Sequence, residues 1–156
     1  MNDVAKGMRR TALAMAGALV LGMGVVGAAW AAETPPTIDG VKVVTADEAK
    51  KMLDGGVPFF DARVATEYAE KTIKGAQSVP YREKSAKAVD FDRKQDQFDL
   101  TRLPADKSKP LVFFCNAGEC WKSYKASVVS RDAGYKQIYW LRGGMPEWVA
   151  KGLPTQ

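Results

Sequence analysis

The chain has 156 residues, of which 46% are hydrophobic, so it is long enough for one buried core and too short for two domains of ordinary size. Its 23 Lys and Arg residues against 18 Asp and Glu residues give a net charge of +5, but the basic residues are interleaved with acidic ones. Nucleic-acid-binding proteins usually concentrate Lys and Arg, so we expect no nucleic acid partner. The chain has no histidine, which excludes imidazole as a general base and removes the commonest metal ligand.

Residues 1–31 have the layout of a secretory signal peptide. A basic start that ends at Arg10 precedes an uncharged apolar stretch over residues 11–32, and Ala29 and Ala31 fit a small-x-small cleavage site. This stretch approaches the ~20 residues that span a bilayer as a helix, so an uncleaved membrane anchor is the alternative. Its many Gly and Ala residues make it weakly hydrophobic, which favours cleavage. In both cases we expect an exported, periplasmic domain, attached to the inner membrane only if the apolar helix remains.

The rest of the chain is predicted to form a linker over residues 32–37 and one domain over residues 38–156. Expected strands cover residues 41–44, 57–60, 75–79, 111–114 and 137–141. Expected helices cover residues 45–53, 65–70, 92–98, 120–133 and 145–151, and the first of them has Thr45 and Glu48 at capping-box spacing. Strands that alternate with helices predict an α/β domain with a parallel sheet and helices on both faces. We interpret the charged residues 81–109 as a surface excursion.

Cys115 is the candidate catalytic residue. It follows the clearest predicted strand and precedes a predicted helix, and ligands of parallel sheets bind at the carboxyl ends of strands. Backbone N–H groups at a helix start lack partners and the helix dipole is positive there, so a thiolate is favoured without histidine. Such a thiolate can carry a second sulfur as a persulfide. An inert core cysteine is the alternative, which fits a glycine-containing turn less well.

The sequence resembles the rhodanese family over residues 38–154. Four elements occur in the family's order: Asp61-Ala62-Arg63 with Glu67, Gly75-Ala76 before Val79-Pro80, the loop that begins at Cys115, and Gly143-Gly144 with Trp148. The resemblance implies an α/β domain whose loop cysteine accepts sulfane sulfur, typically from thiosulfate, and passes it to a thiophilic acceptor such as cyanide or a thiol. It also implies that Asp61, Arg63 and Glu67 give structural support, with Arg63 paired to a carboxylate.

Loop length separates two branches of this fold. By the resemblance, sulfur-transferring members have a six-residue loop counted from the cysteine, whereas related phosphatases have a seven-residue loop that closes on an arginine. Trp121 stands where that arginine would fall, so phosphatase activity is disfavoured. We expect the loop amides to bind a small sulfur-containing anion, namely thiosulfate, sulfite or a persulfide. The residues expected at this substrate-binding loop are Asn116, Ala117, Gly118, Glu119, Cys120 and Lys122.

Two loop residues depart from the rhodanese pattern. Many rhodaneses have a basic or hydroxyl residue at the end of the loop, where this chain has Cys120 preceded by the acidic Glu119. Glu119 is expected to oppose a dianionic donor such as thiosulfate, and Lys122 and Lys125 are candidates to offset it. Cys120 is either a resolving thiol that closes a disulfide with a sulfur-modified Cys115 or a small buried residue, and the sequence leaves both open.

Two hypotheses for function follow. The first is an enzyme that moves sulfane sulfur through a Cys115 persulfide. The second is an exported sulfur-carrier or redox interaction module that uses a Cys115–Cys120 thiol pair with little turnover of small molecules, and whose partner is an exported thiol protein. Neither needs a cofactor or a metal, because two thiolates cannot complete a four-ligand zinc site. Three aromatic side chains near the loop fit core positions better than a pocket mouth, namely Trp121, Tyr124 and Trp148.

Overall fold

The computed structural model describes residues 32–156. The predicted signal peptide, its cleavage site and the alternative anchoring helix therefore lie outside the described residues. Within the described residues, no helix has both the length and the apolar character needed to cross a membrane.

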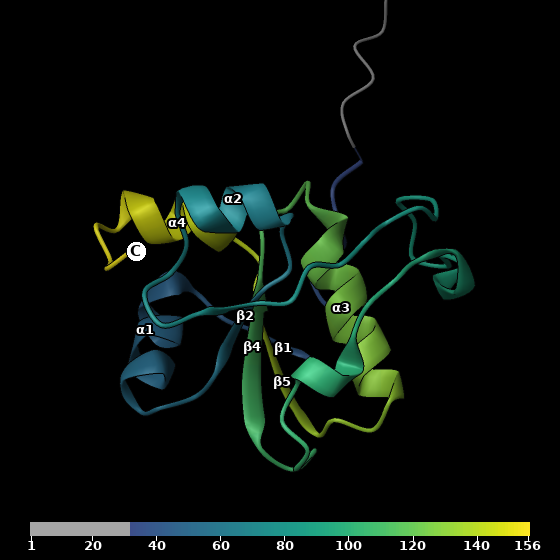
Figure 1. Ribbon diagram of the computed structural model, residues 1–156, viewed down its shortest axis with the longest axis horizontal. Coiled ribbons are helices and arrows are strands. Elements are labelled where there is room, and N and C mark those ends of the chain that lie inside the picture. Colours follow the sequence, from purple (N-terminus) through teal and green to yellow (C-terminus); the bar gives the residue numbers. More distant parts are fainter. Residues whose placement is uncertain (1–31) are drawn as a thin grey trace, which may run out of the picture. The chain divides into compact units, whose positions relative to one another are not determined.

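The domain is built on a five-stranded sheet in which every neighbouring pair of strands is parallel, in the order β1-β5-β4-β2-β3. The strands are β1 (Lys42–Val43), β2 (Phe59–Asp61), β3 (Gln77–Ser78), β4 (Pro110–Phe114) and β5 (Gln137–Leu141). Figure 1 shows three helices on one side of the sheet, which are α1 (Ala46–Asp54), α2 (Ala65–Glu70) and α4 (Gly144–Ala150), and α3 (Trp121–Asp132) on the other. The predicted α/β class, with a parallel sheet and helices on both faces, is confirmed.

Strand β4 lies at the centre of the sheet and is buried on both faces. Val112 and Phe114 pack into the core under α1 and α4, whereas Leu111 and Phe113 pack into the core on the α3 side. All four side chains are fully buried. Successive side chains of a strand point to opposite faces, so an unbroken apolar run is what a doubly covered strand requires.

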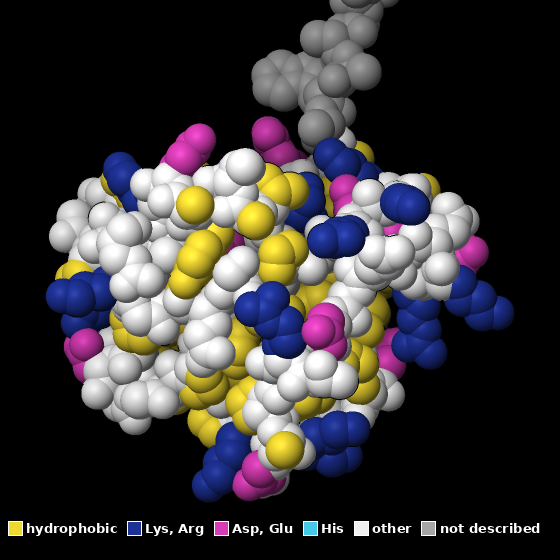
Figure 2. Space-filling model, in the orientation of Figure 1, with side chains coloured by type: hydrophobic (Ala, Val, Ile, Leu, Met, Phe, Trp, Pro, Cys, Tyr) yellow, Lys and Arg dark blue, Asp and Glu magenta, His cyan; other side chains and the backbone are white. Residues whose placement is uncertain are grey.

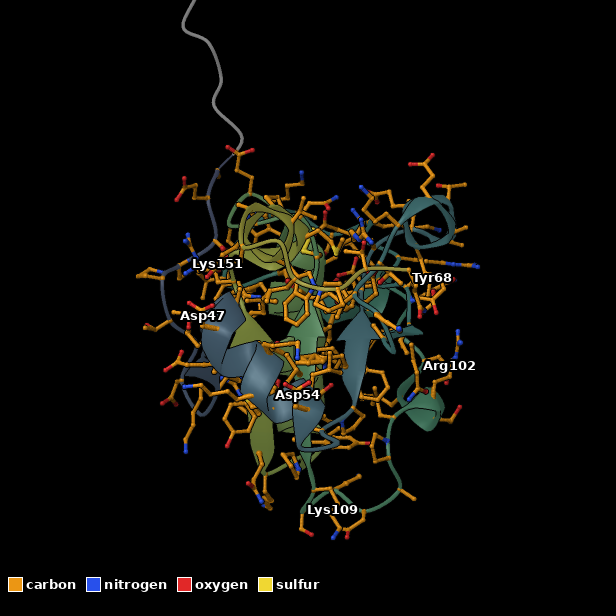
Figure 3. All side chains as sticks on the ribbon, turned by 90° about the vertical axis from the view of Figure 1, so that its left-hand side faces the viewer. Asp47, Asp54, Tyr68, Arg102, Lys109 and Lys151 are labelled. Carbon is orange, nitrogen blue, oxygen red and sulfur yellow. A yellow bond between two sulfur atoms is a disulfide. The ribbon has the colours of Figure 1, made fainter. Side chains whose placement is uncertain are left out.

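Helix α1 begins as its sequence predicts. The Thr45 side chain accepts a hydrogen bond from the Glu48 backbone N–H, and the Glu48 carboxylate accepts one from the Thr45 N–H at 2.8 Å, which completes a capping box. At the surface the Lys151 Nζ atom of the segment after α4 lies 2.6 Å from an Asp47 carboxylate oxygen, a pair that is visible in Figure 3. An exposed pair of this kind adds little stability, so the buried core holds α1 and α4 together.

The helix predicted over residues 92–98 is wrong. Residues 92–98 contain one short 3-10 turn instead, Arg93–Gln95, and a second one, Leu100–Arg102, follows them. Asp92 accepts a hydrogen bond from the Lys94 N–H, and Asp99 accepts one from the Thr101 N–H in the same way. Aspartate side chains that bond to nearby backbone N–H groups compete with continued helix, and here they begin two separate turns.

The 81–109 segment is fixed to α3 by a buried lysine. Lys125 is fully buried in α3, and its Nζ atom lies 2.8 Å from a Glu83 carboxylate oxygen and 2.8 Å from the Ser85 Oγ. Asp96 lies 3.7 Å from the same ammonium. Burial alone would raise the pKa of Asp96, but hydrogen bonds from the Ser85 hydroxyl and from the backbone N–H groups of Ser85 and Lys84 outweigh it and hold that pKa at about 2. Lys125 therefore supports the fold and does not face the substrate loop.

Candidate active site

The predicted cysteine loop joins β4 to α3. Strand β4 ends at Phe114, Cys115 to Cys120 form the six-residue loop, and α3 begins at Trp121 with Cys120 as its N-cap. The loop therefore lies at the carboxyl end of a central strand and at the start of a helix (Figure 1). This is the position at which parallel α/β folds bind ligands.

The two cysteines of the loop form a disulfide. The Sγ atoms of Cys115 and Cys120 are bonded, with their Cα atoms 6.3 Å apart. Cys115 is 1% exposed, whereas Cys120 is partly exposed. The side chain of Cys120 therefore points at Cys115 rather than under the helix, so the two sulfurs reach each other, and the role of Cys120 as a resolving thiol stays a prediction.

Four backbone N–H groups of the loop are free to bind an anion. Within residues 32–156, the amides of residues 116–119 donate no hydrogen bond to a protein acceptor, whereas the Cys120 N–H donates to the Ala117 carbonyl at 3.1 Å. Ala117 has a positive φ of 57°, which is uncommon for a residue with a Cβ and turns the chain tightly around the sulfur. The loop predicted to bind substrate thus has four amides without a protein acceptor, whereas the amide of Cys120 donates within the loop itself.

Gly144, at the start of α4, supports the other side of the loop. It has a φ of +54°, and a Cβ atom there would collide with the Cys115 carbonyl oxygen and the Ala117 nitrogen. The next residue, Met145, donates its N–H to that Cys115 carbonyl at 2.9 Å. A residue with a side chain cannot replace Gly144 without moving the loop. The Gly143-Gly144 pair of the sequence therefore has a packing reason next to Cys115.

A buried hydroxyl, which no local sequence signal indicates, contacts the sulfur of Cys115. The Ser123 Oγ lies 3.0 Å from the Cys115 Sγ and accepts a hydrogen bond from the Trp140 Nε1 at 2.9 Å. A disulfide sulfur carries no proton, so Ser123 is the donor to it and would be the donor to a thiolate as well. The Cys120 carbonyl oxygen lies 3.2 Å from the same sulfur, and only a protonated Cys115 could donate to it.

The three residues predicted as structural support lie behind the loop. Arg63 and Asp61 form a buried ion pair with 2.7 Å between the Arg63 Nη2 and a carboxylate oxygen, and Thr72 donates to the same carboxylate. Glu67 is not part of this pair, since its carboxylate accepts a hydrogen bond from the Asn116 side-chain amide. Arg63 and Asp61 thus stabilise the fold, whereas Glu67 holds the first residue after Cys115 in position.

The charged residues near the loop differ in their surroundings. Glu119 is exposed, so solvent weakens its repulsion of an anion at the loop. Lys122 lines a groove of about 360 Å³ together with Arg82, Glu83 and the start of α2. Figure 2 shows basic and acidic side chains interspersed over one face of the domain. Arg82 is a second cation in this groove. In the sequence it is one of many charged residues between positions 81 and 109, and no local pattern distinguishes it from them.

The segment predicted as a linker lies against the cysteine loop, and we call residues 32–36 the N-terminal strap. Thr34 is 2% exposed and donates both its N–H, at 2.8 Å, and its hydroxyl, at 2.7 Å, to the Gly118 carbonyl. Arg142, which follows β5, donates to the Thr34 carbonyl at 2.8 Å, and the Trp121 indole donates to the Ala32 carbonyl at 2.7 Å. The strap therefore covers the outer rim of the loop.

The aromatic side chains near the loop are part of the core. All three are at least 96% buried, and they belong to two different clusters. The residues are Trp121, Tyr124 and Trp148. Among residues 32–156 there is also no group of three or more Cys, Asp or Glu side chains placed to hold a metal ion.

These features define a class of protein, a parallel α/β domain with a cysteine at the start of a six-residue loop that joins a central strand to a helix. Residues 45–151 match the family described as the rhodanese-like domain, and the chain belongs to that family.

The chain is also similar to curated proteins and to solved structures. The chain is 32% identical over 119 residues to the tRNA uridine(34) hydroxylase of Yersinia pestis (strain Pestoides F), a match that covers 71% of this chain and 30% of the relative. The chain thus spans about a third of the length of the curated relatives that it matches.

Two sulfur-transferring proteins have the same fold. The polysulfide-sulfur transferase homodimer of Wolinella succinogenes is 22% identical with a TM-score of 0.54, over 75% of this chain and 79% of that one. The thiosulfate sulfurtransferase of Pseudomonas aeruginosa is 20% identical with a TM-score of 0.53, over 74% of this chain and 20% of that one.

Proposed function

We propose that this protein is a sulfurtransferase that carries sulfane sulfur as a persulfide on Cys115. The observation that carries the proposal is the environment of the Cys115 sulfur, which lies at a helix start, next to the Ser123 hydroxyl and within a loop that has four free amides. Each of these groups stabilises a sulfur anion more than a neutral thiol. The donor is thiosulfate or a small persulfide, and the acceptor is a thiophile such as cyanide or a thiol.

The reaction needs no general base from the protein. The Cys115 thiolate attacks the outer sulfur of thiosulfate, a sulfur–sulfur bond forms, and sulfite leaves with the electron pair of the bond that breaks. The negative charge stays on sulfur throughout, so fixed N–H dipoles are the form of stabilisation that the step requires. Lys122 and Arg82 supply positive charge in the neighbouring groove, and they attract the anionic donor from solution.

Signal-peptide-directed export to the periplasm is part of the same proposal. An oxidising compartment permits the disulfide between Cys115 and Cys120, whereas the reductants of the cytosol would keep both thiols reduced. In the periplasm the acceptor of the sulfur, or the reductant of the disulfide, is an exported thiol.

Turnover of thiosulfate and cyanide to thiocyanate tests the enzymatic proposal. The purified protein is first reduced and freed of reductant, and wild type, Cys115→Ser and Cys120→Ser are compared. We expect the fastest thiocyanate production from Cys120→Ser, slower production from wild type, because its Cys120 thiol competes with cyanide for the persulfide, and none from Cys115→Ser. Thiocyanate production by Cys115→Ser at the wild-type rate would refute the proposal.

A second candidate function is an exported sulfur-carrier or redox module with little turnover of small molecules. The disulfide favours it, because the pair can exchange with thiols of another protein. This candidate predicts that the reduced protein forms the Cys115–Cys120 disulfide under mild oxidation, while all three proteins of the previous assay produce no thiocyanate. Free alkylation of both thiols after oxidation would exclude it.

A further inference from the structure

We propose that this protein also reduces sulfane sulfur to hydrosulfide, with Cys120 as the resolving thiol and a dithiol as the final reductant. The inference rests on the proposed function, because its starting species is the Cys115 persulfide. It goes further in assigning Cys120 a chemical step, sulfide as a product, and a dithiol as a substrate.

The disulfide shows which sulfur Cys120 can reach. In a persulfide the inner sulfur is the Cys115 Sγ, and this is the atom to which Cys120 is bonded in the structure. Attack of Cys120 on the outer sulfur would only transfer that sulfur to Cys120. Attack on the inner sulfur expels the outer sulfur instead. The Cα–Cα separation of 6.3 Å lies within the range that disulfides adopt, so the loop does not have to unfold for the second reaction.

The step balances in atoms and electrons. The Cys120 thiol gives up its proton and its sulfur attacks the Cys115 Sγ. A bond forms between the two Sγ atoms, the bond from the Cys115 Sγ to the outer sulfur breaks, and the outer sulfur leaves with the electron pair and the proton as hydrosulfide. Two cysteine sulfurs are thereby oxidised to the disulfide, and one sulfane sulfur is reduced by two electrons.

The exposure of the two cysteines determines which sulfur a dithiol attacks when it reduces the disulfide. Cys115 is 1% exposed and Cys120 is partly exposed, so an incoming thiolate attacks the Cys120 Sγ. The Cys115 thiolate is then the leaving group, and the Ser123 hydroxyl at 3.0 Å and the loop amides stabilise it. The second thiol of the reductant closes its own disulfide and releases the Cys120 thiol. In sum, thiosulfate and a dithiol give sulfite, hydrosulfide and the oxidised dithiol.

A single-turnover experiment tests this step separately from the proposed function. The full protein is reduced, freed of reductant and mixed with thiosulfate, and sulfite, sulfide and free thiols are measured. Wild type should release one sulfite and one sulfide per chain and lose both thiols. Cys120→Ser, the matched control, should release sulfite without sulfide and keep the extra sulfur on Cys115, and Cys115→Ser should release neither.

Each result of wild type is decisive. Sulfite without sulfide would overturn the inference and leave the proposed sulfurtransferase standing. Neither product would overturn the proposed function together with the inference that rests on it. Sulfide from Cys120→Ser in the absence of added thiol would also overturn the role of Cys120.

Discussion

The cysteine loop is held from two directions by regions that differ in kind. Helix α3 contacts it with a buried group, since the Ser123 hydroxyl touches the sulfur of Cys115. Lys125, further along the same helix, does not touch the loop but anchors α3 to the 81–109 segment. The N-terminal strap contacts the loop through one buried residue between exposed neighbours, since Thr34 bonds the Gly118 carbonyl and the half-buried Arg142 holds Thr34, whereas Ala32 and Glu33 are exposed.

The two regions differ in how firmly they fix the loop. A buried polar group that loses its partner keeps its full desolvation cost, so the α3 contacts are broken only at large expense in free energy. Apart from the buried Thr34, the strap residues and Arg142 are at least partly exposed, and water can replace the hydrogen bonds that they lose. The strap is thus expected to detach while the domain stays folded. We therefore expect α3 to determine the chemistry of the sulfur and the strap to adjust only the rim of the loop.

Replacing the buried Lys125 should lower the free energy of unfolding more than any other substitution considered below. Lys125→Met leaves the Glu83 and Asp96 carboxylates without their buried cation, and the free energy of unfolding should fall by about 3 kcal/mol. Urea denaturation measures it, with Lys87→Met, an exposed lysine in the same segment, as the control. Equal stability of the two variants would show that the 81–109 segment is not anchored through Lys125.

Acid should weaken the same anchor. The pKa of Asp96 is about 2 in the fold against an ordinary value of 3.8, because its hydrogen bonds favour the charged form. A lowered pKa in the folded state contributes stability that is present above the ordinary value and is lost as pH falls toward the folded value, here about 2 kcal/mol. Urea midpoints between about pH 5 and about pH 2 should fall less in Asp96→Asn than in wild type. Asp90→Asn, at an exposed site in the segment, should follow wild type.

The buried hydroxyl of α3 should change the reactivity of the thiol. Ser123→Ala removes the donor at 3.0 Å from the Cys115 Sγ, so less thiolate forms and alkylation of reduced Cys115 near neutral pH should slow roughly tenfold. The control is Ser130→Ala, a serine on the same helix that is equally buried and whose hydroxyl has no partner among the described residues. Equal slowing in both variants would assign the effect to packing.

The smallest effect should come from the strap. Arg142→Met removes the bonds to the carbonyls of Thr34 and Pro35, and the free energy of unfolding should fall by about 1 kcal/mol or less. Hydrogen exchange at the Thr34 amide should accelerate, while exchange in β4 should not. A loss of stability as large as that of Lys125→Met would mean that the strap is part of the folded core and would remove the difference between the two regions.

The fold could be predicted from the sequence because its signals are local. The apolar run at residues 111–114, the Thr45 and Glu48 capping box and the position of Cys115 each depend on neighbours in the chain. The prediction of a helix over residues 92–98 was wrong because Asp92 and Asp99 each begin a separate short turn.

The contacts that complete the site could not be predicted, because they join residues far apart in sequence. Thr34 bonds Gly118 across 84 positions and Lys125 bonds Ser85 across 40. Ser123 resembles any helix serine until the fold places it against both Cys115 and Trp140. The Cys115–Cys120 disulfide spans a turn in which Ala117 has a positive φ. An alanine does not predict such a backbone conformation.

The intact mass of Cys120→Ser after incubation with thiosulfate shows whether Cys115 carries the transferred sulfur. This variant lacks the thiol that would resolve the persulfide. We expect a gain of one sulfur atom per chain, located on Cys115 and removed by cyanide, and no gain in the double variant that also carries Cys115→Ser. An unchanged mass of Cys120→Ser, or the same gain in the double variant, would contradict this role of Cys115.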